Sequence, residues 1–171
     1  VLVDGAMNRI TQVAVLAGAQ FLFAARVNSE NLSRNAAAIR RQVALASLPA
    51  LPDLPGDLDA LAEAAGLPVP AFGVDGPLTV TSLASVPESA ATIVVDDFTK
   101  VFLDGPGLSA VRRERVLAVR TSVDFGGFCV ALRDVDRDRF LLELADPAAA
   151  ALIAFNPYRA GWGEENVVEP S

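Results

Sequence analysis

The sequence contains no histidine, and only one cysteine and one lysine occur among its 171 residues. Without histidine, a Ser-His-Asp triad, imidazole acid–base catalysis and most zinc sites are excluded within this chain. A single cysteine allows no internal disulfide, which fits a reducing cytoplasm. Cys129 lies in the apolar run FGGFCVAL. We therefore expect it to be a small buried hydrophobic residue rather than a nucleophile.

Long apolar runs and positive charge are also scarce. No apolar run approaches the roughly 20 residues that a membrane-spanning helix requires, and the start lacks the charged region of a signal peptide. Lysine and arginine total 14 against 21 acidic residues, which gives a net charge of −7. An acidic surface repels nucleic-acid backbones. We expect a cytoplasmic chain that binds neither membrane nor nucleic acid.

What is present is a pattern of alternating strands and helices. Apolar runs at 1–3 and 20–26 predict strands, and helical spacing predicts a helix from Asn8 to Gly18 and another that begins near Ser29. The apolar face of the first helix carries Ile10, Val13, Ala14 and Ala17. On the second helix, three arginines fall off the apolar face and are expected to be solvated: Arg34, Arg40 and Arg41.

The rest of the chain continues this alternation beyond a proline-rich segment at 48–57. We expect helices at 58–65, 82–90, 109–115 and 137–144, and strands at 78–81, 92–95, 116–121, 128–132 and 151–155. Gly126-Gly127 predicts a hairpin turn or a bulge. The fold class expected is α/β: three layers with a mainly parallel sheet, a P-loop-NTPase-like remainder with additional C-terminal strands. We place one unit at 1–70 and a second at 71–171, on the same sheet or adjacent to it.

Asp4-Gly5 directly follows the first apolar run. A carboxylate after a buried strand is the form of a Walker B element, which helps to hold magnesium beside a triphosphate. The alternative is a polar turn between strand and loop. The sequence has no G-x-x-x-x-G-K-[ST] motif, so this chain by itself should bind nucleotide weakly or not at all.

Two further strand ends carry polar groups. TIVVDD ends in Asp96-Asp97, with Lys100 shortly after, and ALIAF is followed by Asn156-Pro157. These acids could form a polar cluster at the carboxyl edge of the sheet, with Lys100 paired to a carboxylate or to an anionic partner. Alternatively they cap a turn and form a surface ion pair worth at most about 1 kcal/mol. Asn156-Pro157 is either a simple turn or the rim of a cleft.

Several blocks, taken in order, resemble a known family. VLVDGAMNR with FLFAARVNSENLSRNAAAIRR, then TIVVDDFTKVFL, then ALIAFNPYRAGWG, resemble the small P-loop subunit of lysine aminomutase reactivase. Asn8 departs from the acidic residue that is commoner before Arg9, and the stretch between Val119 and Leu152 is longer than the family pattern.

The resemblance implies part of an ATP-dependent, chaperone-like factor that reactivates an adenosylcobalamin-dependent aminomutase. ATP and magnesium would be its cofactors, and a partner ATPase subunit and the aminomutase its partners. Carried over by position, Asp4 would be the magnesium-side carboxylate, with Gly5 and Arg9 near the nucleotide. Asp97, Thr99 and Lys100 would form a D-x-T-K motif, and Asn156 would belong to the C-terminal motif. The family's P-loop lies upstream of these blocks, so this chain alone is expected to be inactive, with no catalytic residue of its own.

Two other functions stay open. The chain could be a non-catalytic α/β protein-interaction domain whose acidic strand ends only cap and solvate. It could also be an enzyme that uses Asp96, Asp97 and Lys100, although without histidine its acid–base groups would have to be carboxylates or a strongly shifted lysine.

Overall fold

The computed structural model describes residues 20–156, and these divide into two compact units. Unit 1 comprises Gln20 and Arg41–Phe125, and unit 2 comprises Phe21–Arg40 and the described residues from Gly126 onward. Each unit has its own three-stranded sheet with helices packed on it, so the chain is α/β, as expected. The division expected at residue 70 falls inside unit 1.

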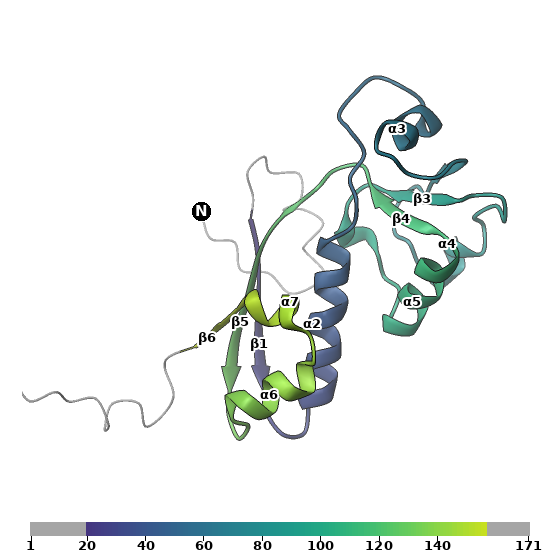
Figure 1. Cartoon of the computed structure of the whole chain (residues 1–171). Helices are drawn as coiled ribbons and strands as arrows, with labels where there is room; N and C mark the ends of the chain where they lie inside the picture. Colours follow the sequence, from purple (N-terminus) through teal and green to yellow (C-terminus); the bar gives the residue numbers. More distant parts are fainter. Residues whose placement is uncertain (1–19, 157–171) are drawn as a thin grey trace, which may run out of the picture. The chain divides into compact units, whose positions relative to one another are not determined.

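Unit 1 contains the parallel sheet β2 (Ala71–Gly73), β3 (Thr92–Val95) and β4 (Val116–Val119), in that order. Its helices are α3 (Leu58–Ala64), α4 (Val80–Leu83), the 3-10 turn η2 (Phe98–Lys100) and α5 (Gly105–Glu114) (Figure 1). All four side chains of β3 are buried, as its unbroken apolar sequence predicts. The core on one side of this sheet joins Ala62 of α3 to Val94 and Ala118.

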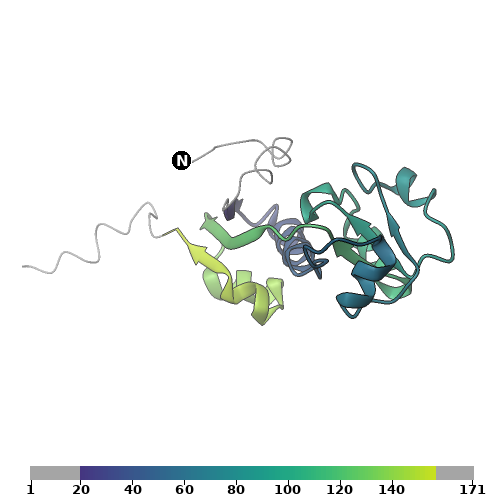
Figure 2. The same cartoon turned by 90° about the horizontal axis from the view of Figure 1, so that it is seen from above.

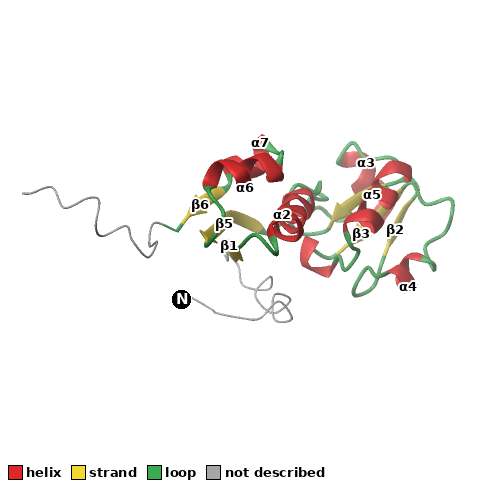
Figure 3. Cartoon of the chain, turned by 90° about the horizontal axis from the view of Figure 1, so that it is seen from below, coloured by secondary structure: helices red, strands yellow, loops and turns green. Residues whose placement is uncertain are grey.

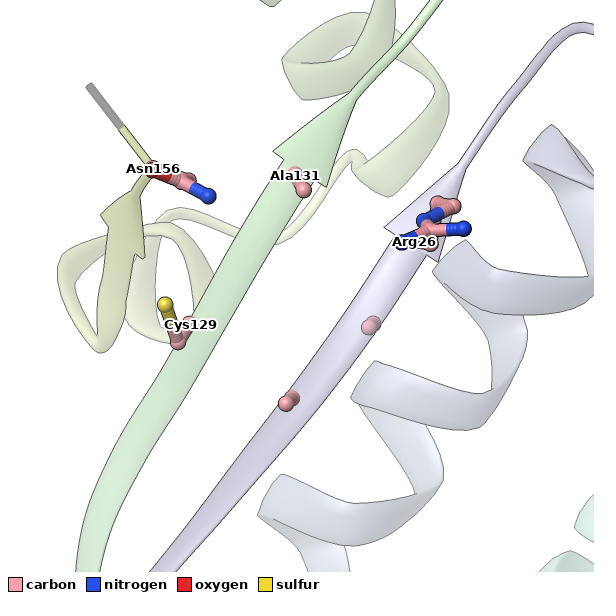
Figure 4. A pocket seen from close by; sticks show the side chains of 6 residues that line it. Arg26, Cys129, Ala131 and Asn156 are labelled. Atoms are coloured by element: carbon pink, nitrogen blue, oxygen red, sulfur yellow. The ribbon is translucent and has the colours of Figure 1, made fainter. Parts of the chain in front are cut away.

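Unit 2 contains the sheet β1 (Gln20–Val27), β5 (Asp124–Leu132) and β6 (Ile153–Phe155), in the order β1-β5-β6. β5 and β6 are parallel, and the arrows of β1 and β5 point the same way (Figure 4). Its helices are the first part of α2 (Leu32–Ala46), α6 (Arg137–Leu144) and α7 (Pro147–Ala151). Figures 2 and 3 show these helices on the same face of the sheet.

The covered face of the unit 2 sheet is built from bulky side chains. Phe128 and Val130 of β5 are buried there, and Phe140 of α6 is fully buried with its ring edge-on to Phe155, 5.9 Å between centroids. From α2, the buried residues follow the spacing i, i+4, i+7 that the sequence predicts: Leu32, Ala36 and Ile39. This side therefore has an ordinary helix-on-sheet core.

The opposite face of the unit 2 sheet carries small side chains that stay exposed. Ala24, Cys129 and Ala154 are exposed, and Leu22 keeps 65% of its surface accessible. Parallel sheets in α/β proteins are normally covered on both faces. Within residues 20–156 of unit 2, only one face has a helical layer, and three layers are not present there.

Two arginines of α2 correct the expectation that they are solvated. Arg40 donates through Nη1 to the carbonyls of Glu143 and Leu144, at 3.0 and 2.8 Å, at the C-terminal end of α6. Arg41 donates to the carbonyls of Leu103 and Val101, at 2.7 and 2.9 Å. Burial lowers the pKa of Arg41 from its ordinary value, while nearby Asp104 acts in the opposite direction. The helical spacing of the sequence could not predict these hydrogen bonds, because the carbonyls that accept them belong to distant segments of the chain.

Other predicted elements need correction at their ends. The strand expected at 78–81 is a single bridge at Leu78, followed by α4, which Thr79 begins with a capping box and which ends at Leu83 instead of continuing to residue 90. α5 begins at Gly105 rather than at 109 because Asp104 caps it and Pro106 fits its first turn. α7 occupies the first residue of the strand expected at 151–155, so β6 begins at Ile153.

Candidate functional site

The carboxyl edge of the unit 2 sheet gathers polar side chains from the ends of all three strands. Asn28 and Ser29 follow β1, Asp134 lies just beyond β5, and Asn156 follows β6. In parallel α/β sheets this edge is where ligands bind. Asn156, expected to shape the rim of a cleft or form a turn, therefore lies at the edge where such a cleft would form.

A direct link joins two of these loops. The Ser29 hydroxyl donates to Asp134 Oδ2, and the Ser29 backbone N–H donates to Oδ1 at 2.9 Å. Next to it, Asn28 and Asn31 exchange reciprocal hydrogen bonds from backbone to side chain, at 2.9 and 3.0 Å, just before α2 begins. These contacts fix the loop after β1 against the loop after β5. In the sequence, only the position of Ser29, three residues after a predicted strand, pointed to contacts at this loop.

The Ser29 hydrogen bonds stabilise the charged form of Asp134. The pKa of Asp134 is lowered from its ordinary 3.8, first by the Ser29 side chain, then by the Ser29 backbone N–H, with a smaller contribution from Arg139. Because the folded-state pKa is depressed, the resulting stability is present above the unfolded-state value and is lost as the pH falls through the folded-state value.

Replacing Ser29 with alanine is expected to raise the pKa of Asp134 toward its ordinary value, because the largest stabilising contact is removed. A carboxyl-carbon NMR titration of the full chain measures this pKa directly. Ser33→Ala is the control, since Ser33 is an exposed serine of the neighbouring helix. An unchanged Asp134 pKa in Ser29→Ala would show that the link does not form in solution.

The open face of this sheet is hollowed into a shallow pocket of about 390 Å³. Its floor is made of small side chains, and Arg26 and Asn156 stand at its carboxyl end (Figure 4). Cys129 corrects the sequence expectation: it is an exposed thiol on this floor, not a buried residue. Its neighbours in sequence, Phe128 and Val130, are the ones that face the core. Successive side chains of a strand point to opposite faces of the sheet, so Cys129 faces away from the core. An apolar run alone does not show which of its residues face the core.

In unit 1, the predicted D-x-T-K residues form a local structure. Asp97 is buried and caps η2, accepting hydrogen bonds through Oδ1 from the backbone N–H of Thr99, at 2.7 Å, and from the Thr99 hydroxyl. Lys100 is the last residue of η2 and is half-buried. Capping, the alternative considered for this motif, thus accounts for the geometry of Asp97 and Thr99.

Asp96 lies beside Asp97 but has a different partner. Its Oδ1 is 3.8 Å from Nε of Arg120, which directly follows β4, and both side chains are about half exposed. Within residues 20–156 this is the one salt bridge, so the ion pair expected between Lys100 and a carboxylate is not formed there. An exposed pair of this kind contributes little to stability.

The expected site residues are thus divided. Asp97, Thr99 and Lys100 belong to unit 1, Asn156 belongs to unit 2, and Asp4, Gly5 and Arg9 lie outside the described residues. Over the described range, no cluster of three or more acidic or cysteine side chains is arranged to hold a metal ion. The expected magnesium ligand, Asp4, is not among the residues on which that finding rests.

Comparison with known proteins returned no match to a protein-family model, a curated protein or a solved structure. None of the helices between residues 20 and 156 combines the length and apolar character that a membrane span would need.

Proposed function

We propose that this chain contributes binding rather than chemistry of its own, as a part of an ATP-dependent factor that reactivates an adenosylcobalamin-dependent aminomutase. The supporting observation is the carboxyl edge of the unit 2 sheet, where polar side chains follow β1, β5 and β6. Asn156, which belongs to the C-terminal block of the family resemblance, is at this edge. The identity of the factor rests on that resemblance.

In this proposal the phosphate-binding loop is upstream of residue 1, in a P-loop-type unit of which this chain is the remainder. Asp4, which follows the apolar residues 1–3, would belong to the nucleotide site of that unit. Its carboxylate would face the magnesium side of the nucleotide, and Arg9 would face the nucleotide or the partner subunit. The parent gene should encode a P-loop within about 150 residues upstream, the length of one domain.

The second candidate is a protein-interaction domain that uses no nucleotide. The observation that favours it is the local use of acidic side chains: Asp97 caps η2, and other aspartates cap α3, α5, α6 and α7, namely Asp57, Asp104, Asp136 and Asp146. Each accepts a backbone hydrogen bond at a helix start, the role in which aspartate is common. In this second candidate function, the aspartates would only stabilise the fold.

Thermal unfolding of the parent protein, with and without Mg-ATP, distinguishes the two candidates. A ligand at 100 times its Kd stabilises the folded state by about 2.7 kcal/mol, so the reactivating factor should unfold at a clearly higher temperature with Mg-ATP. Asp4→Ala should remove most of this shift, whereas Asp53→Ala, at an exposed residue of the 48–57 loop, should preserve it. A parent protein without any Mg-ATP shift would contradict the proposal and favour the interaction domain. A shift that Asp4→Ala leaves intact would contradict the role proposed for Asp4.

A further inference from the structure

We infer that two copies of this chain pair through the outer edge of β1, so that their two three-stranded unit 2 sheets become one sheet of six strands. Within residues 20–156, β1 has β5 as its one neighbouring strand, and its other edge is the end of the sheet. A strand at such an edge presents backbone N–H and carbonyl groups that form a template for a further strand. The inference concerns assembly, and it does not rest on the nucleotide-dependent function proposed above.

The first argument is that the other outer edges of the two sheets are short or occupied. β6 and β2 have three residues each. In β2, the N–H of Ala71 faces away from β3 and donates to Asp59 Oδ1 at 2.6 Å. Residues 49–51 pair with the outer edge of β4 through both backbone groups of Val119. Short strands and edges covered by loops or side chains are the usual protection against pairing with other chains.

β1 has none of these protections along its length. It is eight residues long, it contains no proline, and its sequence QFLFAARV carries one charged side chain, Arg26. Near its start, Leu22 is an apolar residue with 65% of its surface exposed. A long and mostly apolar edge strand of this kind is where pairing with another chain is expected.

The direction of the β1 backbone groups follows from one hydrogen bond. The Val27 carbonyl accepts from the N–H of Arg133, which directly follows β5, at 2.9 Å. The backbone groups of successive strand residues point to opposite edges of the strand, so those of Leu22, Ala24 and Arg26 point away from β5. These are the groups that a second copy would meet at the outer edge.

The second argument is that β1 is complementary to itself. Two identical chains pair most simply about a twofold axis, which makes the two β1 strands antiparallel. With the axis at Phe23, Leu22 lies opposite Ala24 of the second copy, and the two such pairs exchange about four backbone hydrogen bonds. On the other face of the sheet, Phe21 lies opposite Ala25 of the second copy. Each large side chain thus meets a small one, and the two Phe23 side chains form an aromatic pair, a favourable combination across strands.

The charge of β1 and the far edge of the sheet both suit a closed dimer. In this register the two Arg26 residues lie at opposite ends of the paired segment, roughly 20 Å apart, beyond the screening length of about 8 Å at physiological ionic strength. The edge that remains at each end of the joined sheet is β6, which has only three residues. Assembly therefore stops at two chains, because so short an edge strand is a poor template for a third.

Sedimentation velocity of the full chain, at increasing concentrations up to about 1 mM, tests this inference. We expect a monomer–dimer equilibrium, because an interface of a few strand residues is small and small interfaces form weak complexes. Ala24→Pro should raise the dissociation constant about tenfold or more, because proline cannot donate and one hydrogen bond is lost at each of two symmetric positions. Ala24→Ser keeps the N–H, and this matched control should change the dissociation constant by no more than about twofold. A chain that stays monomeric throughout, or a dimer that Ala24→Pro leaves unchanged, would overturn the inference.

A second measurement covers the case in which Ala24→Pro disturbs unit 2 itself. In an equal mixture of isotope-labelled and unlabelled copies of the unmodified chain, isotope-filtered NMR detects contacts between copies alone. We expect such contacts between the methyl groups of Leu22 and Ala24, since side chains directly opposite each other on paired strands are neighbours. Contacts between copies that involve other residues, with none from Leu22 or Ala24, would place the interface elsewhere and overturn the inference.

Discussion

Replacing Gly127 with alanine is expected to destabilise unit 2 by about 3 kcal/mol or more. Gly127 lies inside β5 with φ at +111°, a region that side chains rarely adopt. A Cβ atom at this position would clash with the backbone oxygen of Leu152. That oxygen accepts the hydrogen bond from Phe128 N–H, at 2.8 Å, so relief of the clash would move β6 away from β5.

A urea titration followed through NMR signals of both units measures such losses, with unit 2 signals for Gly127→Ala and unit 1 signals for the control. Gly76→Ala is the matched control: Gly76 also has a positive φ, +81°, but nothing lies within 4 Å of the added Cβ. The control should lose only the conformational cost, about 1 kcal/mol. Equal losses in the two variants would show that the close approach of Leu152 to Gly127 is absent in solution.

Truncating Phe140 to alanine should be about as damaging, with an expected loss of 3–5 kcal/mol, the range for large aromatic residues in protein cores. Phe140 is fully buried, and it packs edge-on against Phe155, which in turn lies 4.9 Å from the Arg137 guanidinium carbon. The variant therefore leaves a cavity where α6 packs against β6.

Leu142→Ala is the control for Phe140→Ala, because Leu142 is on the same helix and 81% exposed. Its loss should stay within about 0.5 kcal/mol, as for other surface positions. Chemical unfolding of the two variants under identical conditions gives the comparison. Similar stabilities for the two variants would mean that α6 does not cover the sheet through Phe140.

The sequence predicted the buried elements well because their apolar patterns are unambiguous. β3, with four buried residues in succession, and α2, with its helical apolar stripe, are both confirmed. Elements controlled by single caps were harder: the helix expected at 109–115 begins at Gly105, because in the turn sequence Asp104-Gly105-Pro106 the aspartate is the N-cap of α5. The same sequence signal can end one segment or begin the next, and only the tertiary contacts decide.

The sequence pattern could not predict which strands pair within each of the two sheets. Unit 2 is made of two segments separated by the whole of Arg41–Phe125, and local periodicity carries no information about such distant pairing. The same reason explains the candidate site. Asn156 was predicted from its place after a strand, but Arg26, which lines the same pocket, comes from a distant segment, and the linked residues Ser29 and Asp134 are 105 residues apart. Ser29 and Asp134 meet only because β1 and β5 are adjacent.

The effect of Mg-ATP on the unfolding temperature of the parent protein tests the proposed function most directly. We predict a clearly higher unfolding temperature with Mg-ATP, and the loss of most of this rise in Asp4→Ala. An unfolding temperature that Mg-ATP leaves unchanged would contradict the account.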